Sequence, residues 1–197
     1  TVSPDHVGPD EARAGRWVSG VLGWWWRYEN GTYPTSTQLL IDGAIYRFDK
    51  RGYMVTGWVY EGGEWFYYGP SGGQASGWVR VQGAWYYLDP HSGAMASGWT
   101  KVRDTWYYLS SSGAMRTGWL RDGSSWFYLS PHGAMATGWH RVGSSWYHFA
   151  DSGRMSTGWL RDGDSWFYLS SSGAMVTGSR WIDGTRYSFD AAGRLVP

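Results

Sequence analysis

One stretch decides the fold, because it recurs with little change along most of the chain. It reads Thr117-Gly118-Trp119-Leu120-Arg121-Asp122-Gly123-Ser124-Ser125-Trp126-Phe127-Tyr128-Leu129-Ser130-Pro131-His132-Gly133-Ala134-Met135. A Gly-Trp pair opens each copy, and its tryptophans stand 20 residues apart, or 21 once, at Trp58, Trp78, Trp99, Trp119, Trp139 and Trp159. A second tryptophan follows seven residues after each, at Trp65, Trp85, Trp106, Trp126, Trp146 and Trp166. Such a period indicates one small unit stacked many times.

Each unit is predicted to contain a strand, a turn, a second strand and a loop. The turn falls at segments such as Arg121-Asp122-Gly123-Ser124, where glycine permits the positive φ of a tight hairpin. The second strand is a quartet such as Trp126-Phe127-Tyr128-Leu129, and a Ser/Gly loop closes the unit. A single hairpin is marginally stable in water, so hairpins must stack. The pattern therefore predicts an all-β solenoid of tandem hairpins.

The repeats divide the chain into four predicted parts. Residues 1–16 are polar and lack periodicity, which is typical of a linker or tail, and residues 17–52 contain divergent N-terminal hairpins. Six tandem repeats occupy residues 53–178, and residues 179–197 form a C-terminal capping hairpin.

Composition excludes several classes of protein. The 197 residues include 17 Trp, 15 Tyr and 30 Gly, and few aliphatic side chains remain to build a helical bundle or a doubly wound sheet. The net charge of +1 argues against capture of nucleic acid, which needs clustered cations. With no cysteine, disulfides and Cys-ligated metals are excluded. No apolar run approaches the length of a membrane span.

Two terminal units separate a packing face from a candidate site. Aligned on the quartet, they read Ile45-Tyr46-Arg47-Phe48 and Arg186-Tyr187-Ser188-Phe189, while Gln38 and Ser179 replace the Gly-Trp tryptophan. Both units keep the second and fourth aromatic or apolar residues and lose the first and third. Because side chains on a strand alternate between faces, the kept face is predicted to be core. The lost face carries two Trp and a Tyr, with Trp58 and Trp65 expected to face each other across the hairpin.

This second face has two interpretations. End units could drop large aromatics simply because a cap should not expose them. Alternatively the aromatics form a cage, since such a box binds quaternary ammonium groups and can also stack on sugars. The cation is favoured, because sugar sites usually add amides or carboxylates and this face is poor in both. All six methionines occupy one repeat position, where a flexible thioether can fill the gap between hairpins and also form the floor of a pocket.

The repeats resemble the choline-binding, or cell-wall-binding, repeats of bacterial autolysins, phage endolysins and surface proteins. The resemblance covers roughly residues 23–197. It implies a left-handed β-superhelix with sites between successive hairpins that bind choline on teichoic or lipoteichoic acid. Two Trp come from one hairpin and a Tyr from the next, often beside a Met.

Carried over to this sequence, the resemblance implies cages of Trp58, Trp65 and Tyr87; Trp78, Trp85 and Tyr108; Trp99, Trp106 and Tyr128; Trp119, Trp126 and His148; and Trp139, Trp146 and Tyr168. The choice of Tyr follows from strand alternation. Met95, Met115, Met135 and Met155 are expected beside these cages. Trp159 and Trp166 meet Ser188, so this site is expected to be weak or empty, and the His148 site should weaken when its ring is protonated.

Related repeats in clostridial toxins and glucan-synthesising enzymes bind carbohydrate, which gives an alternative ligand. A third hypothesis is a structural stalk whose aromatics only pack. The five histidines show no metal-ligand spacing, and the Asp-Gly pairs mark turns, so neither a catalytic site nor a metal nor a cofactor is expected. The resemblance implies a secreted, cell-wall-associated module that tethers an enzyme domain such as a wall hydrolase.

Overall fold

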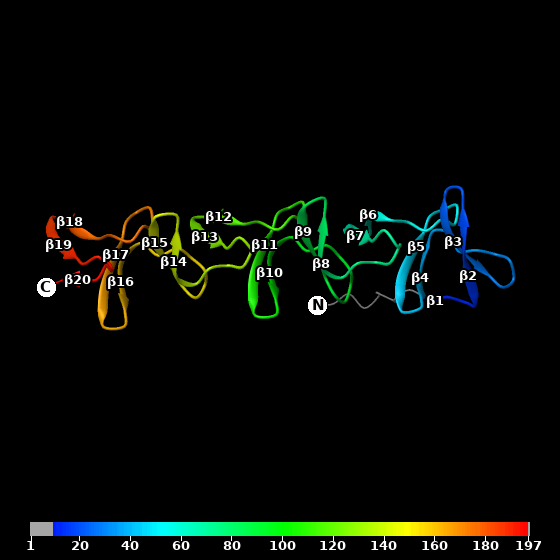
Figure 1. Ribbon diagram of the computed structural model, residues 1–197, viewed down its shortest axis with the longest axis horizontal. Coiled ribbons are helices and arrows are strands. Elements are labelled where there is room, and N and C mark those ends of the chain that lie inside the picture. Colours follow the sequence, from blue (N-terminus) through cyan, green and yellow to red (C-terminus); the bar gives the residue numbers. More distant parts are fainter. Residues whose placement is uncertain (1–9, 197) are drawn as a thin grey trace. The chain divides into compact units, whose positions relative to one another are not determined.

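The computed structural model describes residues 10–196, and over this range the chain forms β-strands and no helix (Figure 1). Within the same range, no helical segment therefore has the length and apolar character needed to cross a membrane. The chain divides into two compact units, one running to Ser97 with residues 112–114 and one comprising 98–111 with the residues from Met115 onward.

Nearly all strands pair with their neighbour in the sequence. The strands of the first unit are β1 (Asp10–Glu11), β2 (Gly15–Gly20), β3 (Gly23–Tyr28), β4 (Thr37–Ile41), β5 (Ala44–Phe48), β6 (Gly57–Glu61), β7 (Glu64–Tyr68), β8 (Gly77–Val81) and β9 (Ala84–Leu88). Those of the second are β10 (Gly98–Val102), β11 (Thr105–Leu109), β12 (Gly118–Asp122), β13 (Ser125–Leu129), β14 (Gly138–Val142), β15 (Ser145–Phe149), β16 (Gly158–Asp162), β17 (Ser165–Leu169), β18 (Gly178–Ile182), β19 (Thr185–Phe189) and β20 (Leu195–Val196). The predicted all-β solenoid of tandem hairpins is confirmed.

The hairpin register differs from the expected one. Trp58 pairs with Tyr67 and Tyr60 pairs with Trp65, so the two tryptophans are diagonal neighbours rather than direct partners. The turn is centred on Gly62 and Gly63, which have φ angles of 61° and 90°. Two residues of positive φ make the tight turn that fits the twist of a hairpin. The expectation of a Trp58–Trp65 pair was wrong because it placed the turn centre one residue too early.

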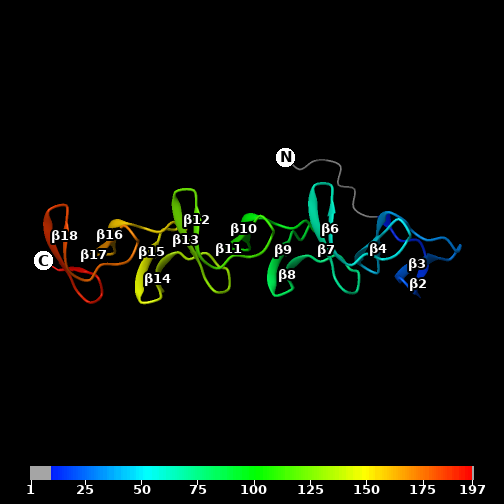
Figure 2. The same cartoon turned by 90° about the horizontal axis from the view of Figure 1, so that it is seen from above.

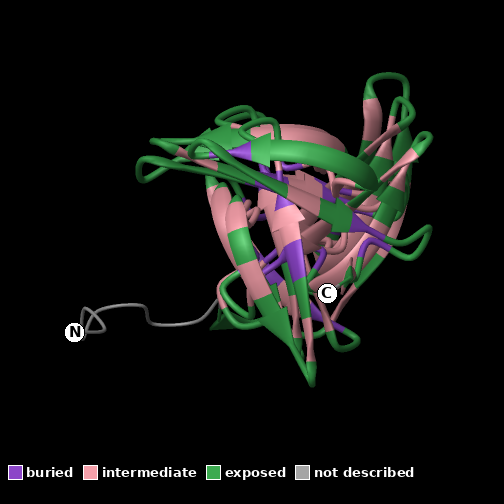
Figure 3. Cartoon of the chain, turned by 90° about the vertical axis from the view of Figure 1, so that its left-hand side faces the viewer, coloured by how far each residue is buried: buried purple, intermediate pink, exposed green. Residues whose placement is uncertain are grey.

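The fourth residue of each quartet forms the core. Its side chain is 0% exposed in every hairpin from β4–β5 to β16–β17, at Phe48, Tyr68, Leu88, Leu109, Leu129, Phe149 and Leu169. The buried positions, purple in Figure 3, lie mostly at the end of the second strand of a hairpin and in the loop that follows, whereas the hairpin tips are exposed. This position is kept in both degenerate units, so the predicted packing face is confirmed.

A methionine and a glycine connect neighbouring hairpins within a unit, as Met155 and Gly173 show. The N–H of Met155 donates to the carbonyl oxygen of Trp126 at 2.7 Å, and Met155 also bridges to Phe149. Its sulfur lies over Gly173, which has a φ of 83° and no room for a Cβ atom. Successive hairpins project to different sides, as β12–β13 and β14–β15 do in Figure 2. Three hairpins on, β16–β17 points the same way as β10–β11 in Figure 1.

The N-terminal segment differs in part from the predicted linker. Residues 1–9 lie outside the described residues. Asp10 and Glu11 pair in parallel with Leu39 and Leu40, and β2 already begins at Gly15. Residues 10–16 are therefore part of the folded N-terminal hairpins.

Candidate functional site

The clearest candidate site is an aromatic cavity of about 440 Å³, called here the Trp119 cage. Trp119 and Trp126 come from β12 and β13, Tyr147 from β15, and Met155 from the loop that follows. The two indole rings are 6.3 Å apart and nearly perpendicular, at 87°, and Tyr147 lies 4.9 Å from Trp119. Three rings at different angles around one cavity form a box rather than a flat platform.

The hairpin geometry explains how these side chains meet. Trp119 and Trp126 lie on the same face of β12–β13, and their diagonal relation opens a corner between the rings. Trp126 stays 41% exposed, so the box is open to solvent on one side. Ser171 and Ser172, from the loop after β16–β17, complete the rim. The cage therefore gathers residues from the β12–β13 and β14–β15 hairpins and from the loop that follows β16–β17.

The same arrangement recurs in both units. In the second unit, a cavity of about 430 Å³ forms the Trp99 cage, lined by Trp99, Trp106, Phe127 and Met135 and also by Asp151, Ser152 and Arg154. In the first unit, a cavity of about 420 Å³ forms the Trp17 cage, made of Trp17, Trp24, Tyr46 and Met54. Trp99 lies 4.8 Å from Phe127, and Trp17 lies 4.8 Å from Tyr46. The similar ring spacings indicate that these three sites are built in the same way.

The third aromatic of each cage is not the residue expected from strand alternation. The structure brings the second residue of the next quartet against the preceding tryptophan, with Tyr147 rather than His148 beside Trp119. The expected residues instead pack on a Trp of their own hairpin at 5.1 to 5.3 Å, in the pairs Trp78–Tyr87, Trp99–Tyr108, Trp119–Tyr128, Trp139–His148 and Trp159–Tyr168. The reason lies in how the hairpins stack. The face of one hairpin that carries the second residue of the quartet packs against the face of the previous hairpin that carries the two tryptophans.

The other predicted tryptophans follow this corrected rule where their neighbours belong to the same unit. Trp58 lies 4.8 Å from Tyr86, and Trp139 lies 4.9 Å from Phe167. The backbone carbonyl oxygens of Trp65 and Trp146 accept hydrogen bonds from the backbone N–H groups of Met95 and Met175, respectively. The sulfur of Met115 lies over Gly133. Trp85, on β9, is 42% exposed.

Two outcomes at the ends were not expected. Trp17 and Trp24 form a cage in the region described above only as divergent hairpins, although their seven-residue spacing is the signal used elsewhere in the chain. At the other end Trp159 meets Tyr187 at 4.8 Å rather than Ser188. Leu195 stands there in the methionine position, bridged to Phe189 as Met155 is to Phe149.

Carboxylates support two of the boxes from outside. The indole N–H of Trp99 donates to Asp122 at 3.0 Å, and that of Trp139 donates to Asp162 at 2.8 Å. Each of these aspartates lies in the hairpin that follows its tryptophan. In the hairpin that follows Trp119, Val142 occupies the same position. Electron-rich rings with a carboxylate behind them stabilise a cation without forming a fixed ion pair inside the box. Among residues 10–196, no cluster of three or more His, Asp or Glu is arranged to hold a metal ion.

His148 makes the stability of this region depend on pH. Its ring lies 5.2 Å from Trp139, Nδ1 is 2.9 Å from the Ser156 hydroxyl, and burial lowers the pKa of His148 below its usual value. The folded state thus prefers the neutral ring, while the unfolded chain binds a proton at higher pH. The resulting contribution to stability is present above about pH 6.5 and is lost as the pH falls through the folded pKa of His148.

We therefore expect the free energy of unfolding to fall between pH 7.5 and pH 5 in part because of His148. His148→Tyr places the residue of other repeats at this position and should flatten that part of the pH profile. Urea unfolding of both proteins across this range measures the difference. Equal pH slopes for the wild type and the variant would contradict the assignment.

Comparison with known proteins agrees with this geometry. The chain matches a family model described as a choline-binding repeat in four segments, at residues 39–76, 62–98, 96–137 and 136–179. It is similar to choline binding protein F of Streptococcus pneumoniae, crystallised with a peptidoglycan analogue, at 35% identity and a TM-score of 0.77 over 88% of this chain and 61% of that chain. The autolysin LytC of the same organism gives 32% and 0.66, over 93% of this chain and 42% of LytC.

A third similar structure, CbpJ from Streptococcus pneumoniae, is 25% identical with a TM-score of 0.74 and is covered over 94% of its length. No curated protein matches the chain. The chain spans less than two thirds of protein F and less than half of LytC. The tryptophans of the Trp99 and Trp119 cages lie within the matched segments, and with more than half of its residues matched the chain belongs to the choline-binding repeat family.

Proposed function

We propose that this chain is a non-catalytic module that holds a parent protein to choline-bearing teichoic or lipoteichoic acid of a bacterial cell wall. The observation that carries the proposal is the Trp119 cage, whose lining is two indoles, a phenol, a thioether and two serines. The lining contains no cation that would repel choline. A trimethylammonium group matches such a box because each ring face attracts it by about 0.5–2 kcal/mol.

The repetition of the cage supports binding to a polymer. Each site alone is expected to be weak, because a few rings supply only modest energy and one side of the box is open. A polymer with repeated choline groups can occupy several cages at once, and the second contact is then effectively intramolecular. The parent protein is proposed to be secreted and wall-associated, with a lytic domain of the kind found in LytC as the first candidate.

The test is a choline titration of the full chain by calorimetry and tryptophan fluorescence, with two tyrosine variants that separate the cage from its surroundings. Tyr147→Ala removes a ring that lines the Trp119 cage and should weaken choline binding there about 2- to 30-fold. Tyr128→Ala removes a ring that also packs on Trp119, at 5.3 Å, but does not line the cavity. This control should lower stability and leave choline affinity nearly unchanged.

Two results would reject the proposal. One is the absence of any response to choline at tens of millimolar, and the other is equal effects of the two tyrosine variants on choline affinity. Retention on dextran combined with indifference to choline would favour the carbohydrate-binding alternative. Retention on walls that is unchanged by loss of the cages would favour a structural stalk.

The outer carboxylates give a further prediction about affinity. Asp162→Asn keeps an oxygen that can accept the Trp139 hydrogen bond but removes the negative charge. We expect choline affinity of the Trp139 site to fall about two- to fivefold at low salt, since a unit charge several ångströms away contributes a fraction of a kcal/mol in a wet environment. Val142→Asp should have the converse effect on the Trp119 cage. The indole N–H resonances of Trp139 and Trp119 report each site separately, and responses that are independent of salt would contradict an electrostatic cause.

A further inference from the structure

The β4–β5 hairpin breaks the repeat for a reason other than capping. It carries Gln38 and Ile45 at the positions of the two cage tryptophans. A cap would stand at an end, but the β2–β3 hairpin precedes it with the Trp17 cage, and β6–β7 follows it. Loss of both tryptophans inside the row of hairpins therefore needs another explanation.

The site formed by this hairpin occupies the same structural position as the cages. The N–H of Gln74 donates to the carbonyl oxygen of Ile45 at 2.8 Å, as that of Met155 does to Trp126. The amide of Gln74 lies over Gly93 in the way that the sulfur of Met155 lies over Gly173. Phe66, the second residue of its quartet, takes the place of Tyr147. One backbone frame thus presents a different set of side chains.

The cavity at this position is larger and more polar than the cages. Its volume is about 570 Å³, compared with about 440 Å³ for the Trp119 cage, since two indoles are missing. Amides, hydroxyls and charged groups line it: Gln38, Gln74, Ser36, Thr37, Ser92, Arg47, Glu61 and Glu64. Asp10 and His91 stand among the remaining lining residues. Phe66 is the aromatic side chain of the lining and is only 7% exposed.

Several of these polar groups are held in place. Nε2 of Gln38 donates to the hydroxyl of Tyr68 at 2.8 Å, and Tyr68 is fully buried, which raises the pKa of its phenol. No residue in the described range hydrogen-bonds to Oε1 of Gln38 or to the side-chain amide of Gln74. Arg47 forms an ion pair with Glu61 across the cavity wall. The cavity therefore offers positioned donors and acceptors.

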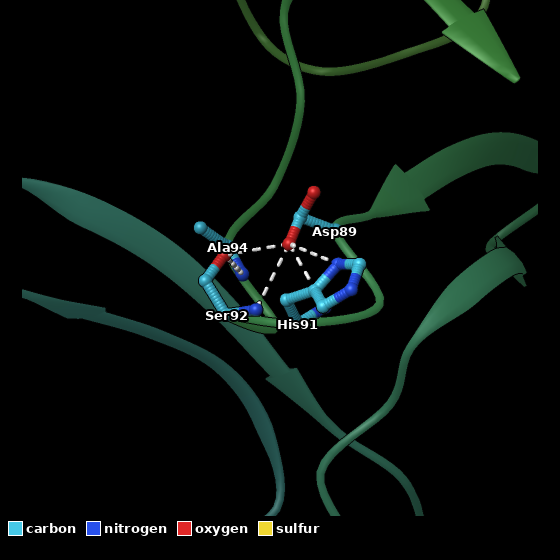
Figure 4. A network of polar contacts seen from close by, with 4 residues as sticks. All are labelled: Asp89, His91, Ser92 and Ala94. Carbon is cyan, nitrogen blue, oxygen red and sulfur yellow. Dashed lines mark hydrogen bonds and ion pairs between the residues drawn. The ribbon is translucent and has the colours of Figure 1, made fainter. Parts of the chain in front are cut away.

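The loop at the cavity rim is also fixed, and it contains the extra residue that makes one repeat spacing 21. Figure 4 shows that Oδ1 of Asp89 accepts hydrogen bonds from the backbone N–H groups of His91 and Ser92, both at 2.9 Å. The Ser92 hydroxyl accepts in turn from the N–H of Ala94 at 3.2 Å. The bond from Ser92 is the main cause that holds the pKa of Asp89 below its usual value, so this carboxylate stays charged. His91 and Ser92 thereby reach the cavity from a shaped loop.

From this arrangement we propose that the β4–β5 cavity binds an uncharged, hydroxyl-rich saccharide unit. Each sugar hydroxyl both donates and accepts, and the cavity supplies amide, hydroxyl, carboxylate and guanidinium partners for both roles. A quaternary ammonium group finds no aromatic box here, because both tryptophans are absent and Phe66 is the one benzene ring in the lining. A phosphate would meet the three carboxylates of Asp10, Glu61 and Glu64 against the single guanidinium of Arg47. The volume lies within the range of about 300–1,000 Å³ common for small-ligand sites.

This site goes beyond the proposed choline function and does not depend on it. The module would read two chemical features of a wall polymer, a cationic substituent at the cages and a neutral sugar at the β4–β5 cavity. The experiment therefore titrates the full chain with three neutral disaccharides, N,N′-diacetylchitobiose, cellobiose and lactose, with and without saturating choline. Amide resonances of Gln38, Gln74 and Ser92 report binding in both conditions.

We expect at least one disaccharide to shift these resonances, and to do so equally when choline fills the cages. Gln74→Met, which installs the usual residue of the repeat, should weaken saccharide binding about 3- to 10-fold and leave choline binding unchanged. Gln38→Trp with Ile45→Trp should abolish saccharide binding and add a choline site. The matched control Trp119→Ala with Trp126→Ala should lose one choline site and keep the saccharide.

Three results would overturn the saccharide assignment. They are no shift with any of the three sugars, a saccharide affinity that Gln74→Met leaves unaltered, or competition between saccharide and choline for the same resonances. Because Gln74→Met changes one side chain over a glycine, its folding can be checked by the wild-type pattern of core amide shifts. Loss of choline binding alone would reject the proposed function and leave the saccharide site standing.

Discussion

Gly153→Ala is expected to lower the free energy of unfolding by about 2–5 kcal/mol. Gly153 has a φ of 80°, and a Cβ atom built on it would overlap the sulfur of Met135. The left-handed backbone costs an alanine about 1–2 kcal/mol, and the overpacking adds about 1–3 kcal/mol. Met135 lines the Trp99 cage, so its displacement should also weaken choline binding there.

Gly143→Ala is the matched control. Gly143 has a comparable φ of 62°, but a Cβ atom there meets nothing within 4 Å. The expected loss is only the backbone part, about 1–2 kcal/mol, with cage affinity unchanged. Urea unfolding and choline titration of both variants measure the difference. Equal losses of stability in the two variants would show that the Met135 side chain moves aside at little cost. The Met–Gly contact would then not hold the hairpins together.

The combined variant Trp106→Ala, Trp126→Ala and Trp146→Ala should weaken retention on choline-bearing walls by about 100-fold or more. These tryptophans are 40%, 41% and 44% exposed, so their removal opens the Trp99 cage, the Trp119 cage and the proposed Trp139 site while disturbing the core little. Retention should fall more steeply than single-site affinity, because each lost cage removes an intramolecular contact. The free choline concentration needed to elute the protein from isolated walls provides the measurement.

Trp181→Ala serves as the control for this prediction. Trp181 is 70% exposed, pairs with Arg186 near the tip of the last hairpin, and lines none of the described cages. Its removal should leave elution unchanged. If the triple variant and Trp181→Ala elute at the same choline concentration, exposed tryptophans in general rather than the cages would account for retention.

Local chemistry made much of the fold readable in the sequence. The 20-residue period, the turn glycines and the alternation within each quartet are all short-range features. They predicted the hairpins and the fully buried fourth position, such as Leu129. The register could not be read as easily, because a shift of the turn centre by one residue preserves the same glycine and tryptophan pattern. Only the backbone hydrogen bonds paired Trp58 with Tyr67.

The candidate site was partly readable for the same reason. Trp119 and Trp126 share a hairpin, so their seven-residue spacing places them on one face. Their third partner comes from another hairpin, and strand alternation says nothing about which face of that hairpin arrives. Because of the way the hairpins stack, Tyr147 contacts Trp119 of the preceding hairpin, whereas His148 packs on Trp139 of its own hairpin.

The sequence by itself determined the repeating hairpin, the core position and the tryptophan pairs, because these depend on contacts within about 20 residues of chain. The tertiary structure alone decided which ring closes each cage. It also showed that Trp17 and Trp24 build a cage and that Gln38, Gln74 and Ser92 line a single polar cavity. The physical reason is that each site gathers side chains from two hairpins and a later loop. Their meeting depends on the rotation from one hairpin to the next, which no local pattern encodes.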